Sequence, residues 1–140
     1  MTAAEAAQTE ASPKPRGGTE TILLVEDELS VRKTTRRILE RHGYNVLEAA
    51  DGSEALRLWQ EHRIKVALLL TDLVLPGGLG GQELGRRLAV EQPGLKVIFA
   101  SGYSADIAGR DFQLRPGEAF VQKPFAMDHL LETIRRCLDG

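Results

Sequence analysis

The sequence is poor in cysteine, because Cys137 is the only one among 140 residues. A single thiol cannot close a disulfide within the chain, and it has no second thiol with which to build a zinc site. The cysteine count therefore argues against a small secreted protein stabilised by disulfide bonds and against a cysteine-rich zinc-binding domain. A reducing, cytoplasmic location is the expectation that follows.

Long apolar runs and a strong net charge are also missing. No segment approaches the roughly 18 consecutive apolar residues of a membrane span, and the chain starts with neither the basic residues nor the apolar stretch of a secretory signal. Lys and Arg together number 18, against 20 Asp and Glu. We therefore expect no membrane or nucleic-acid binding, and partners must be recognised by local features.

Large apolar side chains are absent from residues 1–18, apart from the first methionine. Such a stretch cannot bury enough surface to offset the entropy that is lost on ordering. We predict a disordered tail over residues 1–18 and one folded domain over residues 19–140, a length that suits a single hydrophobic core.

Beyond this tail, short apolar runs alternate with amphipathic segments. Unbroken apolar runs are typical of strands covered on both faces of a parallel sheet. Strands are predicted over residues 22–25, 45–48, 66–70, 97–100 and 119–122. Right-handed crossovers would place the intervening helices on both faces. The pattern therefore predicts an α/β fold with a doubly wound, mainly parallel five-stranded sheet.

The helices are predicted from caps and from apolar spacing. Ser30 is expected to cap the first helix, which Gly43 ends, and Ser53 to open the second. Leu84 and Leu88 mark the third. Apolar residues between 104 and 117 are scattered among glycine, proline and polar residues, so a fourth helix there is expected to be weak or short. A final amphipathic helix begins near residue 127 and completes a set of about five.

Polar residues follow four of the predicted strands. They are Glu26 and Asp27 after the first, Asp72 after the third, Ser101 after the fourth and Lys123 after the fifth. Neighbouring strands lie about 4.8 Å apart, so carboxylates at adjacent strand ends would crowd together. Such a cluster raises a pKa or binds a cation, and oxygen ligands without His or Cys favour Mg²⁺. Each residue alone could equally be a helix cap or a turn residue.

Four sequence blocks, LLVEDE, LLTDLVLPG, FASGY and QKPF, resemble the signature blocks of response-regulator receiver domains. The resemblance extends from about Thr19 to the C-terminus, and the order and spacing of the blocks make it specific. It implies a flavodoxin-like fold with strand order 2-1-3-4-5. The double glycine after Pro76 is similar to receivers of hybrid sensor kinases and of some free-standing regulators.

The resemblance also implies a role for each residue of the acidic cluster. Asp72 would be the nucleophile that takes a phosphoryl group from a phosphohistidine. Mg²⁺ would be held by the side chains of Asp27 and Asp72 and by the backbone carbonyl of Val74, with Glu26 acting through a water molecule. Lys123 would contact the phosphoryl group, or pair with the carboxylates in its absence.

Three further positions are carried over in the same way. Ser101 resembles the hydroxyl residue that turns inward to bind the phosphoryl group, with a strand-end cap as the alternative. Phe120 stands at the switch-aromatic position, where the family often has tyrosine, so a readout that needs the tyrosine hydroxyl is in doubt. Pro124 matches a family position that is preceded by a cis peptide bond.

The function implied is two-component phosphorelay signalling. The donor would be a histidine kinase or a histidine phosphotransfer domain, and the output would be altered binding of an unknown downstream protein, by a monomer or weak dimer without a DNA-binding output domain. The first helix carries a basic surface where a donor kinase could dock, although a solvated face is equally open. Its residues are Arg32, Lys33, Arg36, Arg37 and Arg41.

Two other functions fit the sequence less well. A phosphohydrolase of the haloacid dehalogenase type would carry a second aspartate two residues after the nucleophile as general acid, but Val74 stands there. A flavin carrier of the flavodoxin type would need a Ser/Thr-rich phosphate loop after the first strand, which is missing. We therefore expect no enzyme in the usual sense, only a protein that catalyses its own phosphorylation and dephosphorylation. Whether it is free-standing, a phosphate sink or part of a hybrid kinase stays open.

Overall fold

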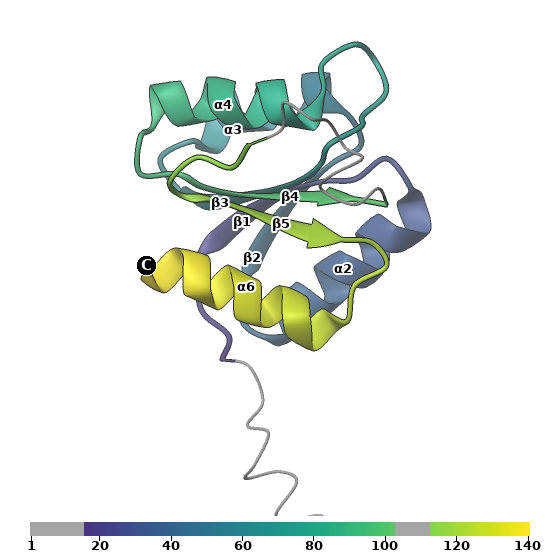
Figure 1. Cartoon of the computed structure of the whole chain (residues 1–140), viewed down its shortest axis with the longest axis vertical. Coiled ribbons are helices and arrows are strands. Elements are labelled where there is room, and N and C mark those ends of the chain that lie inside the picture. Colours follow the sequence, from purple (N-terminus) through teal and green to yellow (C-terminus); the bar gives the residue numbers. More distant parts are fainter. Residues whose placement is uncertain (1–15, 103–112) are drawn as a thin grey trace, which may run out of the picture.

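The computed structural model describes residues 16–102 and 113–140 (Figure 1). Five parallel strands form one sheet in the order β2-β1-β3-β4-β5. The strands are β1 (Thr21–Val25), β2 (Asn45–Ala49), β3 (Val66–Asp72), β4 (Lys96–Ser101) and β5 (Glu118–Gln122). All five lie where the apolar runs predicted them, and the predicted doubly wound architecture and strand order are confirmed.

The described residues form four helices. They are α2 (Leu29–Arg41), α3 (Gly52–His62), α4 (Gly81–Glu91) and α6 (Met127–Asp139). The weak helix expected between residues 104 and 117 falls mostly in 103–112, outside the described residues. Most of the predicted tail, residues 1–15, is outside them as well. Residues 16–18 are described, and the Gly18 amide donates a hydrogen bond to the carbonyl of His42 at 3.0 Å.

The helices cover the sheet on both faces, with α2 and α6 on one side and α3 and α4 on the other (Figure 1). Strand β1 shows why its sequence is apolar throughout. Ile22 and Leu24 belong to the core beneath α2 and α6, and the alternating Leu23 and Val25 belong to the core beneath α3 and α4. A strand that faces two cores has no solvent side on which to place a polar residue.

The only tryptophan, Trp59, is completely buried in the second of these cores. Its indole nitrogen donates a hydrogen bond of 3.3 Å to the carboxylate of Glu91, in the last turn of α4. Arg63 approaches the same carboxylate at 3.4 Å. This contact joins α3 to α4 at the end of α4 that is far from Asp72.

The starts of two helices differ from the prediction. Helix α2 begins at Leu29 with Glu28 at the cap position, and Ser30 lies inside the first turn, where its hydroxyl donates to Glu28. Asp51, and not Ser53, caps α3 by accepting a hydrogen bond from the Glu54 amide at 2.8 Å. The Glu54 carboxylate accepts in turn from the Ala50 amide, so the two acidic side chains form a reciprocal cap.

Among the described residues, no helix combines the length and the apolar character that crossing a bilayer would require.

Helix α4 begins in close contact with the end of β3, and Gly81 makes this possible. A β-carbon on Gly81 would lie 1.8 Å from the carbonyl oxygen of Asp72. The Gly81 amide also donates a hydrogen bond of 2.8 Å to the carbonyl of Leu73. The glycine therefore lets the helix pack directly on the backbone that carries Asp72.

Substitution of Gly81 by alanine is expected to lower the free energy of unfolding by about 1–3 kcal/mol, because the backbone of β3 must move to admit a methyl group. Urea unfolding would measure the loss. Gly94→Ala is the matched control, since no atom lies within 4 Å of the β-carbon position there. Equal stabilities for the two variants would show that the close approach at Gly81 is not required.

Candidate functional site

Three carboxylates meet at the carboxyl edge of the sheet. Strands β1 and β3 are neighbours with Val25 opposite Thr71, so Glu26 and Asp72 leave the sheet at the same level. One carboxylate oxygen each from Glu26, Asp27 and Asp72 lies within 4.8 Å of the others. Glu26 and Asp72 are buried, 4 % and 7 % exposed, whereas Asp27 is exposed. The structure thus brings together the acidic residues that the sequence analysis singled out.

Lys123 is the cation of this cluster. Its ammonium nitrogen lies 2.8 Å from an oxygen of Asp72 and forms a second ion pair with Glu26. The residue follows β5, and its backbone amide donates a hydrogen bond of 2.7 Å to the carbonyl of Ser101, which anchors it to the end of β4. Two buried carboxylates therefore share one ammonium group.

This shortage of positive charge changes the pKa values of the cluster. Burial, together with the neighbouring Glu26, raises the pKa of Asp72 to about 7, although Lys123 acts in the opposite direction. Burial disfavours ionisation of Glu26 as well, but hydrogen bonds with Asp72, Lys123 and the Glu28 amide outweigh it and lower the pKa of Glu26. The pKa of Lys123 is raised because its two carboxylate partners outweigh its burial. Of the two buried carboxyl groups, Asp72 is therefore the one that is protonated more easily.

The donor set fits a hard divalent cation. All three side chains offer carboxylate oxygen, and this is the ligand type that Mg²⁺ prefers. A buried pair of carboxylates with a single ammonium partner also gains from additional positive charge. Val74 lies two residues after β3, and its hydrocarbon side chain has no donor atom, so only its backbone could serve as a ligand. The ligand role of its carbonyl stays a prediction.

The loop after Asp72 is held on both sides. The Leu73 amide donates to the Ala100 carbonyl at 2.9 Å, and the Leu73 carbonyl accepts from Gly81. Between them, Gly77 and Gly78 adopt φ values of 90° and 89°, which residues with a β-carbon rarely adopt. The double glycine thus makes a tight turn between the end of β3 and the start of α4.

The remaining predicted residues lie on β4, on β5 and just beyond. Ser101 ends β4 and is buried. Phe120 is half-buried on β5, opposite Phe99, and packs against the core beneath α3 and α4. The Lys123–Pro124 peptide bond is cis, as the resemblance implied. The switching roles of Ser101 and Phe120 stay predictions.

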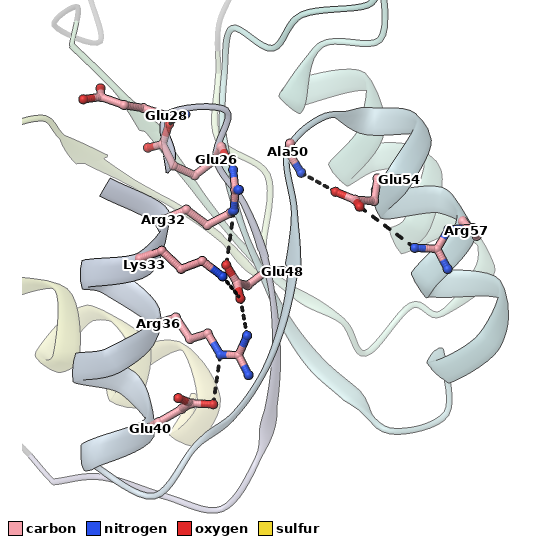
Figure 2. A network of polar contacts seen from close by, with 10 residues as sticks. All are labelled: Glu26, Glu28, Arg32, Lys33, Arg36, Glu40, Glu48, Ala50, Glu54 and Arg57. Carbon is pink, nitrogen blue, oxygen red and sulfur yellow. Dashed lines mark hydrogen bonds and ion pairs between the residues drawn. The ribbon is translucent and has the colours of Figure 1, made fainter. Parts of the chain in front are cut away.

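Glu48 forms ion pairs beside the acidic cluster that the sequence analysis did not predict. It lies on β2 with its side chain 10 % exposed, and its carboxylate forms ion pairs with Arg32, Lys33 and Arg36 of α2 (Figure 2). Three of the five basic residues proposed as a docking surface therefore form ion pairs with Glu48. The sequence does contain a signal for this contact. Glu48 is the one acidic residue in a strand predicted to be covered by helices, and a buried charge needs a partner of opposite charge.

Comparison with known proteins agrees with this geometry. Residues 22–135 match the response regulator receiver domain family, so the chain belongs to that family of two-component signalling domains. Among its relatives is the sensor kinase CckA of Brucella abortus, 38 % identical over 122 residues, which are 87 % of this chain but 13 % of the kinase. The response regulator receiver protein CpdR of the same organism is 34 % identical over 117 residues, 84 % of this chain and 95 % of CpdR.

A solved structure of the receiver domain of the hybrid histidine kinase CckA superimposes with a TM-score of 0.71 at 36 % identity. The match covers 84 % of this chain and 98 % of that domain. The likeness therefore includes one receiver domain in full and only a small part of the complete kinase.

Substitution of Asp72 by asparagine is expected to raise the free energy of unfolding of the metal-free protein by at most about 4 kcal/mol at neutral pH. Because the pKa of Asp72 is raised from 3.8 to about 7, the folded state binds this proton more tightly than the unfolded state. The cost of ionising Asp72 is absent below about pH 3.8 and complete above about pH 7.

The increase in the free energy of unfolding caused by Asp72→Asn should therefore be larger at about pH 8 than at about pH 5, as measured by urea unfolding in EDTA. Glu132→Gln, on an exposed position of α6, is the control and should show no such trend. An equal increase in the free energy of unfolding at both pH values would contradict a raised pKa of Asp72.

Proposed function

We propose that this receiver domain accepts a phosphoryl group on Asp72 from the phosphohistidine of a histidine kinase or of a histidine phosphotransfer domain, and that it signals by altered binding of a partner protein. The observation that carries the proposal is the ion pair of buried Asp72 with Lys123, within 4.8 Å of two further carboxylates. Phosphoryl transfer needs positioning and charge neutralisation more than acid-base groups, and this edge of the sheet offers both.

Each residue of the cluster then has a defined task. An oxygen of Asp72 attacks phosphorus, the bond from phosphorus to the histidine nitrogen breaks, and its electron pair stays on the imidazole ring. The product is a mixed anhydride of phosphate and the Asp72 carboxyl. Lys123 is close enough to Asp72 to neutralise a phosphoryl oxygen, and the Ser101 hydroxyl donates to another.

Mg²⁺ would be held by Asp27, Asp72 and the carbonyl of Val74, with Glu26 acting through a water molecule. When bound, the ion supplies the positive charge that Lys123 alone does not provide. Asp27 fits this task because it combines exposure to solvent with proximity to the two buried acids. Ionised Asp72, which burial disfavours in the absence of a cation, is the form that attacks phosphorus.

Turnover of small phosphate esters is not part of the proposal. Val74 occupies the position at which a haloacid dehalogenase-type enzyme carries its general acid, and its side chain cannot protonate a leaving group. Membership of the receiver family is consistent with a protein whose chemistry is its own phosphorylation and dephosphorylation.

Incubation with acetyl phosphate and Mg²⁺ should add one phosphoryl group to the protein, seen by intact mass spectrometry as an acid-stable, base-labile adduct. EDTA should abolish it, because the carboxylate cluster then lacks its cation. Asp72→Ala should remain unmodified, whereas Asp128→Asn, at an exposed position of α6, should be modified like the wild type. An adduct that persists in Asp72→Ala, or steady hydrolysis of a generic phosphatase substrate, would overturn the proposal.

A further inference from the structure

Arg32 connects the acidic cluster to a second charged group on the neighbouring strand. Its Nη1 atom donates a hydrogen bond of 2.7 Å to the backbone carbonyl of Glu26. Its Nε atom pairs with the carboxylate of Glu48 on β2 at 3.2 Å. Figure 2 shows the guanidinium between the end of β1 and Glu48. One side chain of α2 thus spans two strands.

Both charged partners are largely covered. The side chain of Arg32 is 14 % exposed and that of Glu48 is 10 % exposed. Lys33 and Arg36 complete the surroundings of the Glu48 carboxylate, which holds it in place. The planar guanidinium of Arg32 can reach the carbonyl and the carboxylate at once, because its donors have fixed and different directions.

Glu26 is fixed through every polar group that it has. Its amide donates to Ala49 at 3.0 Å, and its carboxylate accepts from the Glu28 amide at 3.0 Å and from Lys123. Its carbonyl is held by Arg32. Because a peptide unit is planar, the direction of this carbonyl also fixes the plane from which Asp27 departs.

Asp27 depends on that plane. Within residues 16–102 and 113–140, no hydrogen bond or ion pair holds its carboxylate. The side chain nevertheless lies within 4.8 Å of the two buried acids. The backbone on either side therefore sets the point from which this side chain departs. Two side chains hold that backbone, Arg32 at the Glu26 carbonyl and Glu26 itself at the Glu28 amide.

We propose that Arg32, supported by Glu48, is a positioning residue that presets the backbone between Glu26 and Asp27 for a divalent cation. The inference rests on the proposed function, because it takes this cluster to be a Mg²⁺ site. The effect on Mg²⁺ affinity expected when Arg32 is replaced is opposite to the effect expected from its charge alone. Loss of a positive charge near a cation site would strengthen Mg²⁺ binding, whereas loss of positioning would weaken it.

Two variants test this opposition. Arg32→Gln and Arg32→Lys should each weaken Mg²⁺ binding about tenfold, measured by isothermal titration calorimetry on the full chain. The lysine variant keeps the charge but cannot contact the carbonyl and Glu48 together. Arg36→Gln is the matched control, since the polar contacts of Arg36 within the described part of the chain are with Glu40 and Glu48 and not with Glu26. It should bind Mg²⁺ as tightly as the wild type, or more tightly.

A second readout does not require the metal. In metal-free protein, the backbone amide resonances of Glu26, Asp27 and Glu28 should shift in both Arg32 variants and stay in place in Arg36→Gln. Binding of Mg²⁺ by Arg32→Gln at or above the wild-type affinity would overturn the inference and leave the proposed function intact. Failure of the wild-type protein itself to bind Mg²⁺ would overturn both.

Discussion

Two buried carboxylates share one ammonium group at the carboxyl edge of the sheet, and this unequal sharing is the constraint on which the site depends. Lys123 balances one negative charge, so the second must be neutralised by a proton on Asp72 or by a cation. Burial strengthens the demand, because a low-dielectric site penalises an uncompensated charge. The ionisation of Asp72, the residue proposed to accept the phosphoryl group, therefore depends on whether a cation is bound beside it.

The fold was predictable because its signals are local. Apolar runs mark strands that are covered on both faces. Because parallel strands bring their carboxyl ends to one edge of the sheet, the sequence alone predicts that Glu26, Asp72 and Lys123 lie at the same edge. The helix caps were less predictable, since Asp51 and Ser53 are both good capping residues and only the path of the chain selects between them. The segment 103–112, with the weak fourth helix, lies outside the described residues.

The contact between Arg32 and Glu48 could not be read from the sequence for a different reason. It depends on the face of α2 that is turned toward β2, and on a side chain long enough to pass from one strand to the next. A basic helix was evident, but its basic residues divide into two kinds. Arg32, Lys33 and Arg36 form ion pairs with Glu48, whereas Arg37 and Arg41 are exposed and take no part in that network. Only residues of the second kind remain fully available to a docking partner.

The position of Trp59 determines which part of the protein its intrinsic fluorescence reports on. The indole is buried against Glu91 at the last turn of α4, and Gly81 begins that helix beside Asp72. Eleven residues at 1.5 Å rise separate these two ends by about 15 Å. The fluorescence of Trp59 should therefore report first on the packing of α3 against α4, because the indole contacts the end of α4 that lies away from the acidic cluster.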